Sequence, residues 1–200
     1  MADFEFSRRQ VLGGSIYATV GAGAAGLVPT VAVAEVPQER PSSAETHDIV
    51  LWLNGVDRPL RVESRTTLAE ALRGPLGLTG TKIGCNRGAC SACTVWLDGA
   101  PICSCMTFAV EVGSRAVTTI EGLAHGDDLH PVQEAFVAHD AMQCGFCTPG
   151  MAMSAAALLE RNADPTDEDV KRAISGHICR CGTYPHVVAA TLAAAKARRG

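Results

Sequence analysis

Nine cysteines lie in the second part of this 200-residue chain, and their spacing is regular enough to indicate metal binding. Cys85, Cys90 and Cys93 follow the pattern C-x4-C-x2-C, and Cys103 and Cys105 lie further downstream. This spacing lets one loop wrap one side of a [2Fe-2S] cluster while a more distant cysteine closes the other side. A zinc site more often presents two C-x2-C pairs, so the pattern predicts iron and sulfide rather than zinc.

The residues around these cysteines suit an anionic cluster. They are small, so backbone N–H groups can approach the sulfur atoms; they are Gly84, Gly88, Ala89, Ser91 and Ala92. Lys82 and Arg87 are placed to offset negative charge. The fourth thiolate stays open, because Cys103 and Cys105 are two residues apart on an expected strand and would share one face.

A second set of thiols consists of the pair Cys144-x2-Cys147 and the pair Cys179-x-Cys181. Each pair comes just before an expected helix start, where oriented N–H groups favour thiolates and negative charge. Four thiolates from two such loops could hold one [2Fe-2S] cluster or one zinc ion, and the spacing alone leaves both open.

Strand-like patterns surround the first set. Residues 49–53 alternate in hydrophobicity and end at Asn54-Gly55, a hairpin turn after which residues 60–62 can return. Thr66 or Thr67 can cap a short helix that runs through Leu72. A second hairpin is expected over 93–97 and 100–105, and a further strand over 117–120. The region is predicted to be a small mixed sheet with one helix.

From Leu129 onward the hydrophobic period becomes helical. Helix starts are expected at His130-Pro131, Thr148-Pro149, Thr166 and Pro185, since Thr and Pro are favoured in these positions. The order is helix, C-x2-C, helix, then helix, C-x-C, helix. It indicates a pseudo-symmetric four-helix unit with one thiol pair from each half.

The first 34 residues have the pattern of a targeting signal. Arg8-Arg9 precede an uncharged stretch over 11–34, which ends in the A-x-A pattern of Val31 to Ala34. This resembles a twin-arginine export signal cleaved after Ala34, with 35–47 as a linker. The alternative is an uncleaved membrane anchor over 11–28, which five glycines and Pro29 disfavour. No later segment is long and apolar enough to cross a membrane.

Charge and composition narrow the function classes. The 17 Lys and Arg are outnumbered by 21 Asp and Glu, giving a net charge of -4, so nucleic acid is not an expected partner. Aromatic residues make up only 4% of the chain, which favours a fold held together in part by what its thiols bind.

Four strings carry a family resemblance: GTKIGCNRGACSACTVWLDG, SCMTFAV, QCGFCTPGM and ICRCGTYPHVVAA. Over about residues 48–195 the chain resembles the small iron-sulfur subunit of the molybdenum hydroxylases, a group that includes xanthine dehydrogenases, aldehyde oxidoreductases and carbon monoxide dehydrogenase. The resemblance implies an α+β chain. An N-terminal β-grasp, plant-type ferredoxin-like domain (48–122) would precede an all-α four-helix bundle domain (123–200), each with one [2Fe-2S] cluster.

The resemblance also implies roles for single residues. Cys105 would complete the first cluster site with Cys85, Cys90 and Cys93, which leaves Cys103 spare. The second cluster would take its iron ligands from Cys144, Cys147, Cys179 and Cys181. Gln143 and Cys181 would contact the pterin of a molybdopterin cytosine dinucleotide, which a large partner subunit holds.

The implied function is that of an electron-transfer subunit in a periplasmic molybdenum-dependent hydroxylase, of the aldehyde-oxidising kind. Two clusters would relay electrons from the molybdopterin site to an external acceptor, and no residue of this chain would be catalytic. The partners would include the large molybdopterin-binding subunit. An FAD subunit or a c-type cytochrome could be a further partner. The alternatives are a free-standing periplasmic ferredoxin-like carrier and a secreted disulfide-stapled or zinc-binding module.

Three positions depart from the family's pattern. Ser91 stands where glycine is usual, so the loop is expected to need a left-handed serine. Residues 181–184 read Cys-Gly-Thr-Tyr in place of the commoner Cys-Thr-Gly-Tyr. His177 stands where asparagine is frequent, and it is expected to be an exposed loop histidine.

Overall fold

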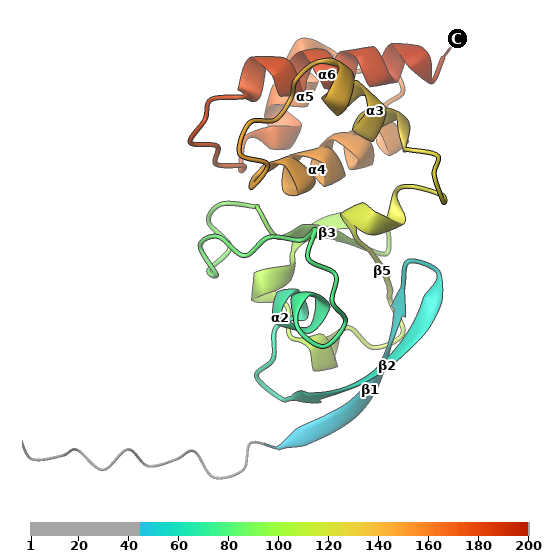
Figure 1. Cartoon of the computed structure of the whole chain (residues 1–200), viewed down its shortest axis with the longest axis vertical. Helices are drawn as coiled ribbons and strands as arrows, with labels where there is room; N and C mark the ends of the chain where they lie inside the picture. The colour runs from blue at the N-terminus through green and yellow to red at the C-terminus, as the bar shows by residue number, and fades with distance from the viewer. Residues whose placement is uncertain (1–44, 200) are drawn as a thin grey trace, which may run out of the picture. The chain divides into compact units, whose positions relative to one another are not determined.

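The computed structural model describes residues 45–199. A five-stranded mixed sheet forms the first half of this region (Figure 1). The strands follow the order β2-β1-β5-β3-β4. They are β1 (Thr46–Leu53), β2 (Val56–Glu63), β3 (Thr94–Leu97), β4 (Ala100–Cys103) and β5 (Ala116–Thr118). Strands β1 and β5 run parallel, and the other neighbours are antiparallel. The predicted export signal and its cleavage site lie outside the described residues.

Both predicted hairpins are confirmed at their turns. Asn54 and Gly55 join β1 to β2 with φ values of 50° and 78°, and Asp98 and Gly99 join β3 to β4 with 50° and 77°. Two successive residues with positive φ give the turn whose twist matches that of the strands, which explains the Asn-Gly and Asp-Gly sequences.

Helix α2 (Leu68–Arg73) packs against the sheet and begins at a capping box. Thr67 Oγ1 accepts a hydrogen bond from Glu70 N at 3.2 Å, and the Glu70 carboxylate accepts one from Thr67 N at 2.9 Å. Leu68 and Leu72 are fully buried in the same core as Leu51 of β1. The sequence allowed Thr66 or Thr67 as the N-cap of this helix, and the structure shows that it is Thr67.

The end of β4 differs from the prediction. The strand stops at Cys103, and Ser104–Met106 form a 3-10 turn, η1. The buried Ser104 Oγ donates to Cys93 O at 2.7 Å, which holds the chain in a turn rather than in the ladder. Strand β5 likewise ends at Thr118, before a 3-10 turn, η3 (Ile120–Gly122). A third 3-10 turn, η2, covers Ala109–Glu111.

Four helices make up the second half (Figure 1). They are α3 (Pro131–Ala138), α4 (Thr148–Arg161), α5 (Asp167–Ile174) and α6 (Tyr184–Ala197). Their starts agree with the sequence prediction, with Pro131, Pro149 and Pro185 in first turns. Helix α4 is buried from residue 150 to 157, and its small residues let the other elements approach closely. The described residues contain no helix that meets the length and hydropathy needed to cross a membrane.

Helix α4 also packs on the sheet. Trp96 of β3 donates its indole N–H to Met153 O at 2.9 Å, and Gly150 lies so close to Ser91 that a Cβ there would be 2.4 Å from its carbonyl oxygen. Glycine is therefore required at position 150 for this contact. The two halves meet where the cysteine loops emerge.

Candidate metal centres

The first cysteine loop lies between α2 and β3 and is shaped by left-handed residues. Asn86, Gly88 and Ser91 have φ values of 50°, 73° and 55°, so the left-handed serine expected from the sequence is present. The turns aim backbone donors at sulfur. Arg87 N and Ala89 N donate to Cys85 Sγ at 3.5 and 3.1 Å, as the small residues of this loop predicted.

The thiols of this loop meet in pairs. The N–H of Arg87 and, after it, the thiol of Cys90 lower the pKa of Cys85 to about 7, against the effect of burial. Burial raises the pKa of Cys105 to about 11, and its contact with Cys93 raises it further. Gly88 N also donates to Cys105 Sγ at 3.3 Å. The chain thus places Cys85 beside Cys90 and Cys93 beside Cys105.

Cys103 and Cys105 have different surroundings, because the strand that was expected to align them ends between them. Cys105 is buried and interacts with Cys93 and Cys85. Cys103 lies opposite Thr94 in the ladder, with its Sγ 3.9 Å from Gly88 O. The expectation that both cysteines lie on one strand is therefore wrong, although Cys103 still packs against the cluster that contains Cys93 and Cys105.

The second set of thiols comes from the two loops that precede α4 and α6. Burial raises the pKa of Cys147 to about 11, and the adjoining Cys179 thiol adds to this. At Cys181 a hydrogen bond from the Cys144 backbone lowers the pKa, but the Cys144 thiol and burial outweigh it, so the pKa is raised. The pairs are Cys147 with Cys179 and Cys144 with Cys181, and each pair joins the two loops.

This pairing fits a [2Fe-2S] cluster. Each iron of such a cluster takes two protein thiolates, and bridging sulfides fill its remaining positions. A structural zinc ion would need four ligands around a single point. Within residues 45–199 no group of three His, Cys, Asp or Glu side chains is placed to bind one metal ion. A binuclear cluster does not need such a group, because each of its irons takes only two protein thiolates. The donors present suit two binuclear clusters.

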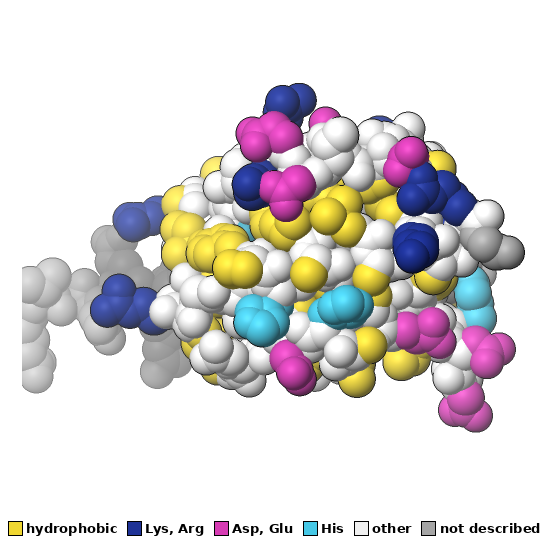
Figure 2. All heavy atoms as spheres, turned by 90° about the horizontal axis from the view of Figure 1, so that it is seen from above, with side chains coloured by type: hydrophobic (Ala, Val, Ile, Leu, Met, Phe, Trp, Pro, Cys, Tyr) yellow, Lys and Arg dark blue, Asp and Glu magenta, His cyan; other side chains and the backbone are white. Residues whose placement is uncertain are grey.

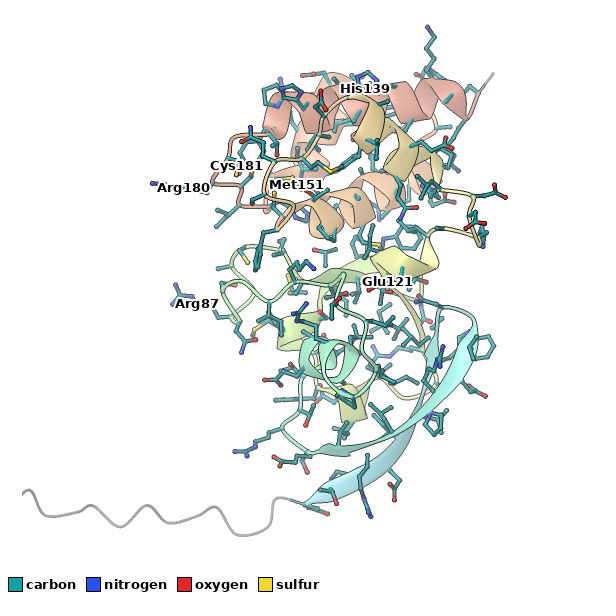
Figure 3. All side chains as sticks on the ribbon, viewed as in Figure 1. Arg87, Glu121, His139, Met151, Arg180 and Cys181 are labelled. Atoms are coloured by element: carbon teal, nitrogen blue, oxygen red, sulfur yellow. The ribbon has the colours of Figure 1, made fainter. Side chains whose placement is uncertain are left out.

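Charged and polar groups surround the thiols unevenly. Arg87 and Arg180 are exposed and point outward at the same edge of the molecule as Cys181 (Figure 3). The Lys82 ammonium, in contrast, donates to Thr79 O at 2.5 Å. Gln143 is exposed beside the exposed Cys144.

Exposed apolar side chains are frequent on the helical half, and they include Leu129, Val137, Met142, Phe146 and Ile178. The view onto the helical end shows hydrophobic side chains gathered in a band between acidic and basic groups (Figure 2). The loops that contain Cys144 and Cys179 thus combine thiols with exposed apolar surface.

His177 is buried, with 5% of its surface exposed, so the expectation of an exposed loop histidine is wrong. Its Nε2 lies 2.7 Å from Ser154 Oγ of α4, and burial lowers its pKa to about 4. The loop after α5 folds back onto α4, which no local pattern in the sequence signals.

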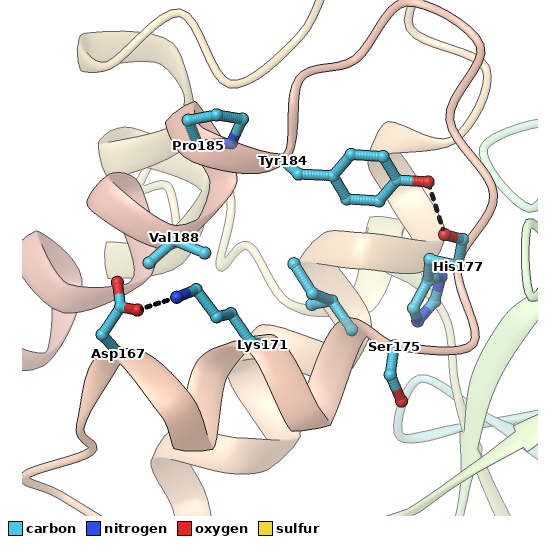
Figure 4. A pocket seen from close by; sticks show the side chains of 8 residues that line it. Asp167, Lys171, Ser175, His177, Tyr184, Pro185 and Val188 are labelled. Carbon is cyan, nitrogen blue, oxygen red and sulfur yellow. Dashed lines mark hydrogen bonds and ion pairs between the residues drawn. The ribbon is translucent and has the colours of Figure 1, made fainter.

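Two further residues hold the loop of Cys179. The Tyr184 hydroxyl accepts a hydrogen bond from Cys179 N at 2.8 Å and donates one to His177 O at 2.9 Å. Tyr184 and His177 both line a cavity of about 510 Å³, which the Asp167–Lys171 ion pair borders (Figure 4). Thr183 Oγ1 lies 3.3 Å from Cys179 Sγ, and hydrogen bonds from Thr183 offset burial and lower the pKa of Cys179 to about 7. Neither Tyr184 nor Thr183 was predicted from the sequence to have a role.

The two cysteine sites touch through their loops. Ile178 N donates to Cys90 O at 3.2 Å, so a residue next to Cys179 is bonded to a cysteine of the first set. The Phe146 ring lies near Gly84, where a Cβ would be 3.4 Å from Cε1. A short route of covalent bonds and one hydrogen bond therefore joins the two sets of thiols.

Comparison with known families accounts for both halves. Residues 52–116 match the 2Fe-2S iron-sulfur cluster binding domain, and residues 119–192 match the [2Fe-2S] binding domain. Each match contains one complete set of thiols.

Similar proteins cover most of this chain. The small subunit of nicotine 6-hydroxylase from Paenarthrobacter nicotinovorans is 47% identical over 152 residues, which are 76% of this chain and 92% of that protein. The aldehyde oxidoreductase iron-sulfur-binding subunit PaoA of Escherichia coli K12 is 38% identical over 203 residues, 94% of this chain and 87% of that subunit. In the crystal structure of quinoline 2-oxidoreductase from Pseudomonas putida 86, one chain superposes with a TM-score of 0.75 at 44% identity, covering 78% of this chain and 99% of that one.

Proposed function

We propose that this chain, which belongs to the [2Fe-2S] iron-sulfur subunits of the molybdenum hydroxylases, carries electrons from a molybdopterin site on a partner subunit to an external acceptor. A [2Fe-2S] cluster, when bound, accepts and releases one electron at a time. The residues of this chain hold, insulate and connect two such clusters. The chain is a non-catalytic subunit of an oxidoreductase complex.

The observation that carries this proposal is the hydrogen bond between the two loops that contain the paired thiols. Cys90 contributes to the first set, and its carbonyl accepts the N–H of Ile178, the neighbour of Cys179 in the second. Buried Cys93, Cys105 and Cys147 keep water from parts of both sites. An electron can therefore pass between the sites through protein bonds rather than through solvent.

We assign the finer layout and the ligands on the same basis. Residues 48–122 form a β-grasp, plant-type ferredoxin domain, and residues 123–200 form a four-helix bundle. The ligands of the first cluster are Cys85, Cys90, Cys93 and Cys105, and those of the second are Cys144, Cys147, Cys179 and Cys181. The side-chain pairs described above support this assignment.

The second cluster is proposed to lie nearer to molybdenum. Gln143 and Cys144 are exposed at its loop, together with the apolar side chains of Met142 and Phe146, so this surface can meet a large subunit. There the Gln143 amide and Cys181 would contact the pterin of a molybdopterin cytosine dinucleotide. An FAD subunit or a c-type cytochrome would then accept electrons from the first cluster.

We propose aldehydes as the substrates and the periplasm as the location. The similarity to the aldehyde oxidoreductase subunit covers 94% of this chain, so it reaches into the first 44 residues. Those residues contain the Arg8-Arg9 pair and the A-x-A pattern ending at Ala34. Replacing both arginines with lysine should retain the protein in the cytoplasm, and unchanged export in cell fractions would contradict a twin-arginine signal.

The proposal is tested on the native complex, purified without oxygen and analysed for iron, molybdenum and paramagnetic signals. We expect about four irons per chain and two distinct signals after reduction. Cys85→Ser should remove one signal and Cys147→Ser the other. A protein that purifies alone with both clusters would favour the free-standing carrier, and a colourless protein without iron would contradict both functions.

A further inference from the structure

The Thr183 hydroxyl is buried against one of the proposed iron ligands. Its Oγ1 lies 3.3 Å from Cys179 Sγ, within the range of a hydrogen bond to sulfur, and only 2% of the Thr183 surface is exposed. In the part of the chain that the structure describes, the other donors to cluster thiols, apart from neighbouring cysteines, are backbone N–H groups. Thr183 is therefore the donor that a substitution can remove without changing the backbone.

The direction of this hydrogen bond is fixed once iron is bound. Between a thiol and a hydroxyl either group can donate, but a cysteine that ligates iron is a thiolate and has no proton to give. Thr183 must then be the donor and Cys179 Sγ the acceptor.

The loop geometry keeps the hydroxyl in place. Tyr184 accepts the Cys179 N–H at 2.8 Å and donates to His177 O at 2.9 Å, so the loop is closed on itself on both sides of Cys179. His177 is in turn anchored to Ser154 of α4 at 2.7 Å. Thr183 lies between Cys179 and Tyr184 in the chain and is the last residue before α6. It is buried between the loop and the helices.

We propose that Thr183 raises the reduction potential of the cluster held by Cys144, Cys147, Cys179 and Cys181, a role that rests on the function proposed above. Reduction adds one negative charge to a cluster that is already anionic. A hydrogen bond to a ligand sulfur stabilises the reduced state more than the oxidised state, and so raises the potential. Thr183 is a positioning and tuning residue, since it acts through Cys179 rather than on a substrate.

The test is a reductive titration of the purified holo complex with dithionite and mediators, in which the paramagnetic signals of both clusters are followed. Thr183→Val keeps the branched shape and removes the hydroxyl. We expect the midpoint potential of the second cluster to shift to more negative values, while that of the first cluster stays unchanged and serves as an internal control. Thr183→Ser, which keeps the hydroxyl, should retain the potential of the unmodified protein.

Thr191→Val provides a matched control, because Thr191 is also buried but donates its hydroxyl to Val187 O within α6. Neither potential should move in this variant. If Thr183→Val does not retain iron, Thr183→Ser and Thr183→Ala give the same comparison in a less crowded site, with the negative shift expected only in the alanine variant.

The outcomes separate this inference from the proposed function. Two clusters with full iron content and an unchanged second potential in the valine and alanine variants would overturn the role of Thr183. A positive shift would overturn it as well. Absence of both cluster signals from the unmodified protein would instead overturn the electron-transfer function itself.

Discussion

At the scale of single residues, the pKa of a cysteine thiol depends on the groups that surround its sulfur. Cys85 receives two backbone N–H groups, and its pKa falls to about 7. Cys105 and Cys147 are buried, and their pKa values rise to about 11. A metal that replaces the proton removes the cost of an isolated buried thiolate, so these two positions should depend most strongly on being ligated.

The choice between Cys103 and Cys105 gives a direct prediction. Cys105→Ser should lower the iron content by about half, because one of two binuclear clusters loses a ligand, and should remove the signal assigned to the first cluster. Cys103→Ser should leave iron content and both signals intact. Iron analysis with paramagnetic resonance checks both variants, and the reverse pattern would transfer the ligand role to Cys103.

Residue spacing predicted much of this chemistry, but not all of it. The two groups of cysteines, with Cys103 and Cys105 as alternatives in the first, and the left-handed Ser91 follow from local sequence, since loop length and backbone sterics are local properties. The burial of His177 and the hydroxyl of Thr183 against Cys179 depend on how a loop folds back onto α4. Neither could be deduced from residues adjacent in the chain.

At the scale of elements, α3 begins with a histidine cap that works in one protonation state only. His130 Nδ1 accepts from Val132 N at 3.2 Å, which requires an unprotonated nitrogen. Burial is the main reason that the pKa of His130 is lowered, and Arg198, which directly follows α6, and His125 lower it further. Glu160 of α4 acts in the opposite direction.

We expect the free energy of unfolding to fall as the pH drops below about 6.5, the ordinary histidine pKa in an unfolded chain. In that range His130 is protonated in the unfolded chain but not in the folded chain, so protonation favours unfolding. The stability that neutral His130 contributes is fully lost once the pH is below its lowered pKa in the folded chain. The loss should be on the order of 1 kcal/mol, as for other N-caps. Urea unfolding of the holo protein and of a His130→Asn variant between pH 8 and 5 measures it, because buried His177, whose pKa is lowered to about 4, contributes equally to both proteins.

His130→Asn is the matched control, because asparagine caps a helix without titrating in this range. The difference in stability between this variant and the unmodified chain should therefore change with pH. A constant difference across the range would show that His130 does not control the cap.

Element boundaries were predictable where the signal is local. The helix starts at Pro131, Thr148 and Asp167 follow from caps and prolines that act within one turn. The end of β4 was not predictable, because the bond from Ser104 Oγ to Cys93 O joins segments eleven residues apart.

At the scale of the whole described unit, the proposed electron transfer depends on contact between the two cysteine loops. The bond from Ile178 N to Cys90 O links their loops, and α4 packs against both β3 and the first loop. The sequence predicted two cluster-binding halves but not this contact, because nothing in either half encodes the other's surface. Gly150 and Gly176 both face Ser91, and they differ in what an added methyl group would meet.

Gly150→Ala should disturb this contact while leaving both clusters bound. A Cβ at position 150 would lie 2.4 Å from Ser91 O, a backbone atom that cannot rotate away. Overpacking of this kind costs about 1–3 kcal/mol, which exceeds the gain of about 1 kcal/mol from replacing a helical glycine. We therefore expect a net loss of stability and a wider separation of the two loops.

The separation should appear as a weaker magnetic interaction between the two reduced clusters and slower electron transfer between them, with the iron content unchanged. Gly176→Ala is the control, because its Cβ would be 3.3 Å from Ser91 Oγ, a side-chain atom that can rotate away. If both variants behaved alike, the close approach of α4 to the first loop would not be what couples the sites. If only Gly150→Ala weakened the interaction while each cluster kept its own potential, the coupling would reside in the packing between the halves rather than in either site.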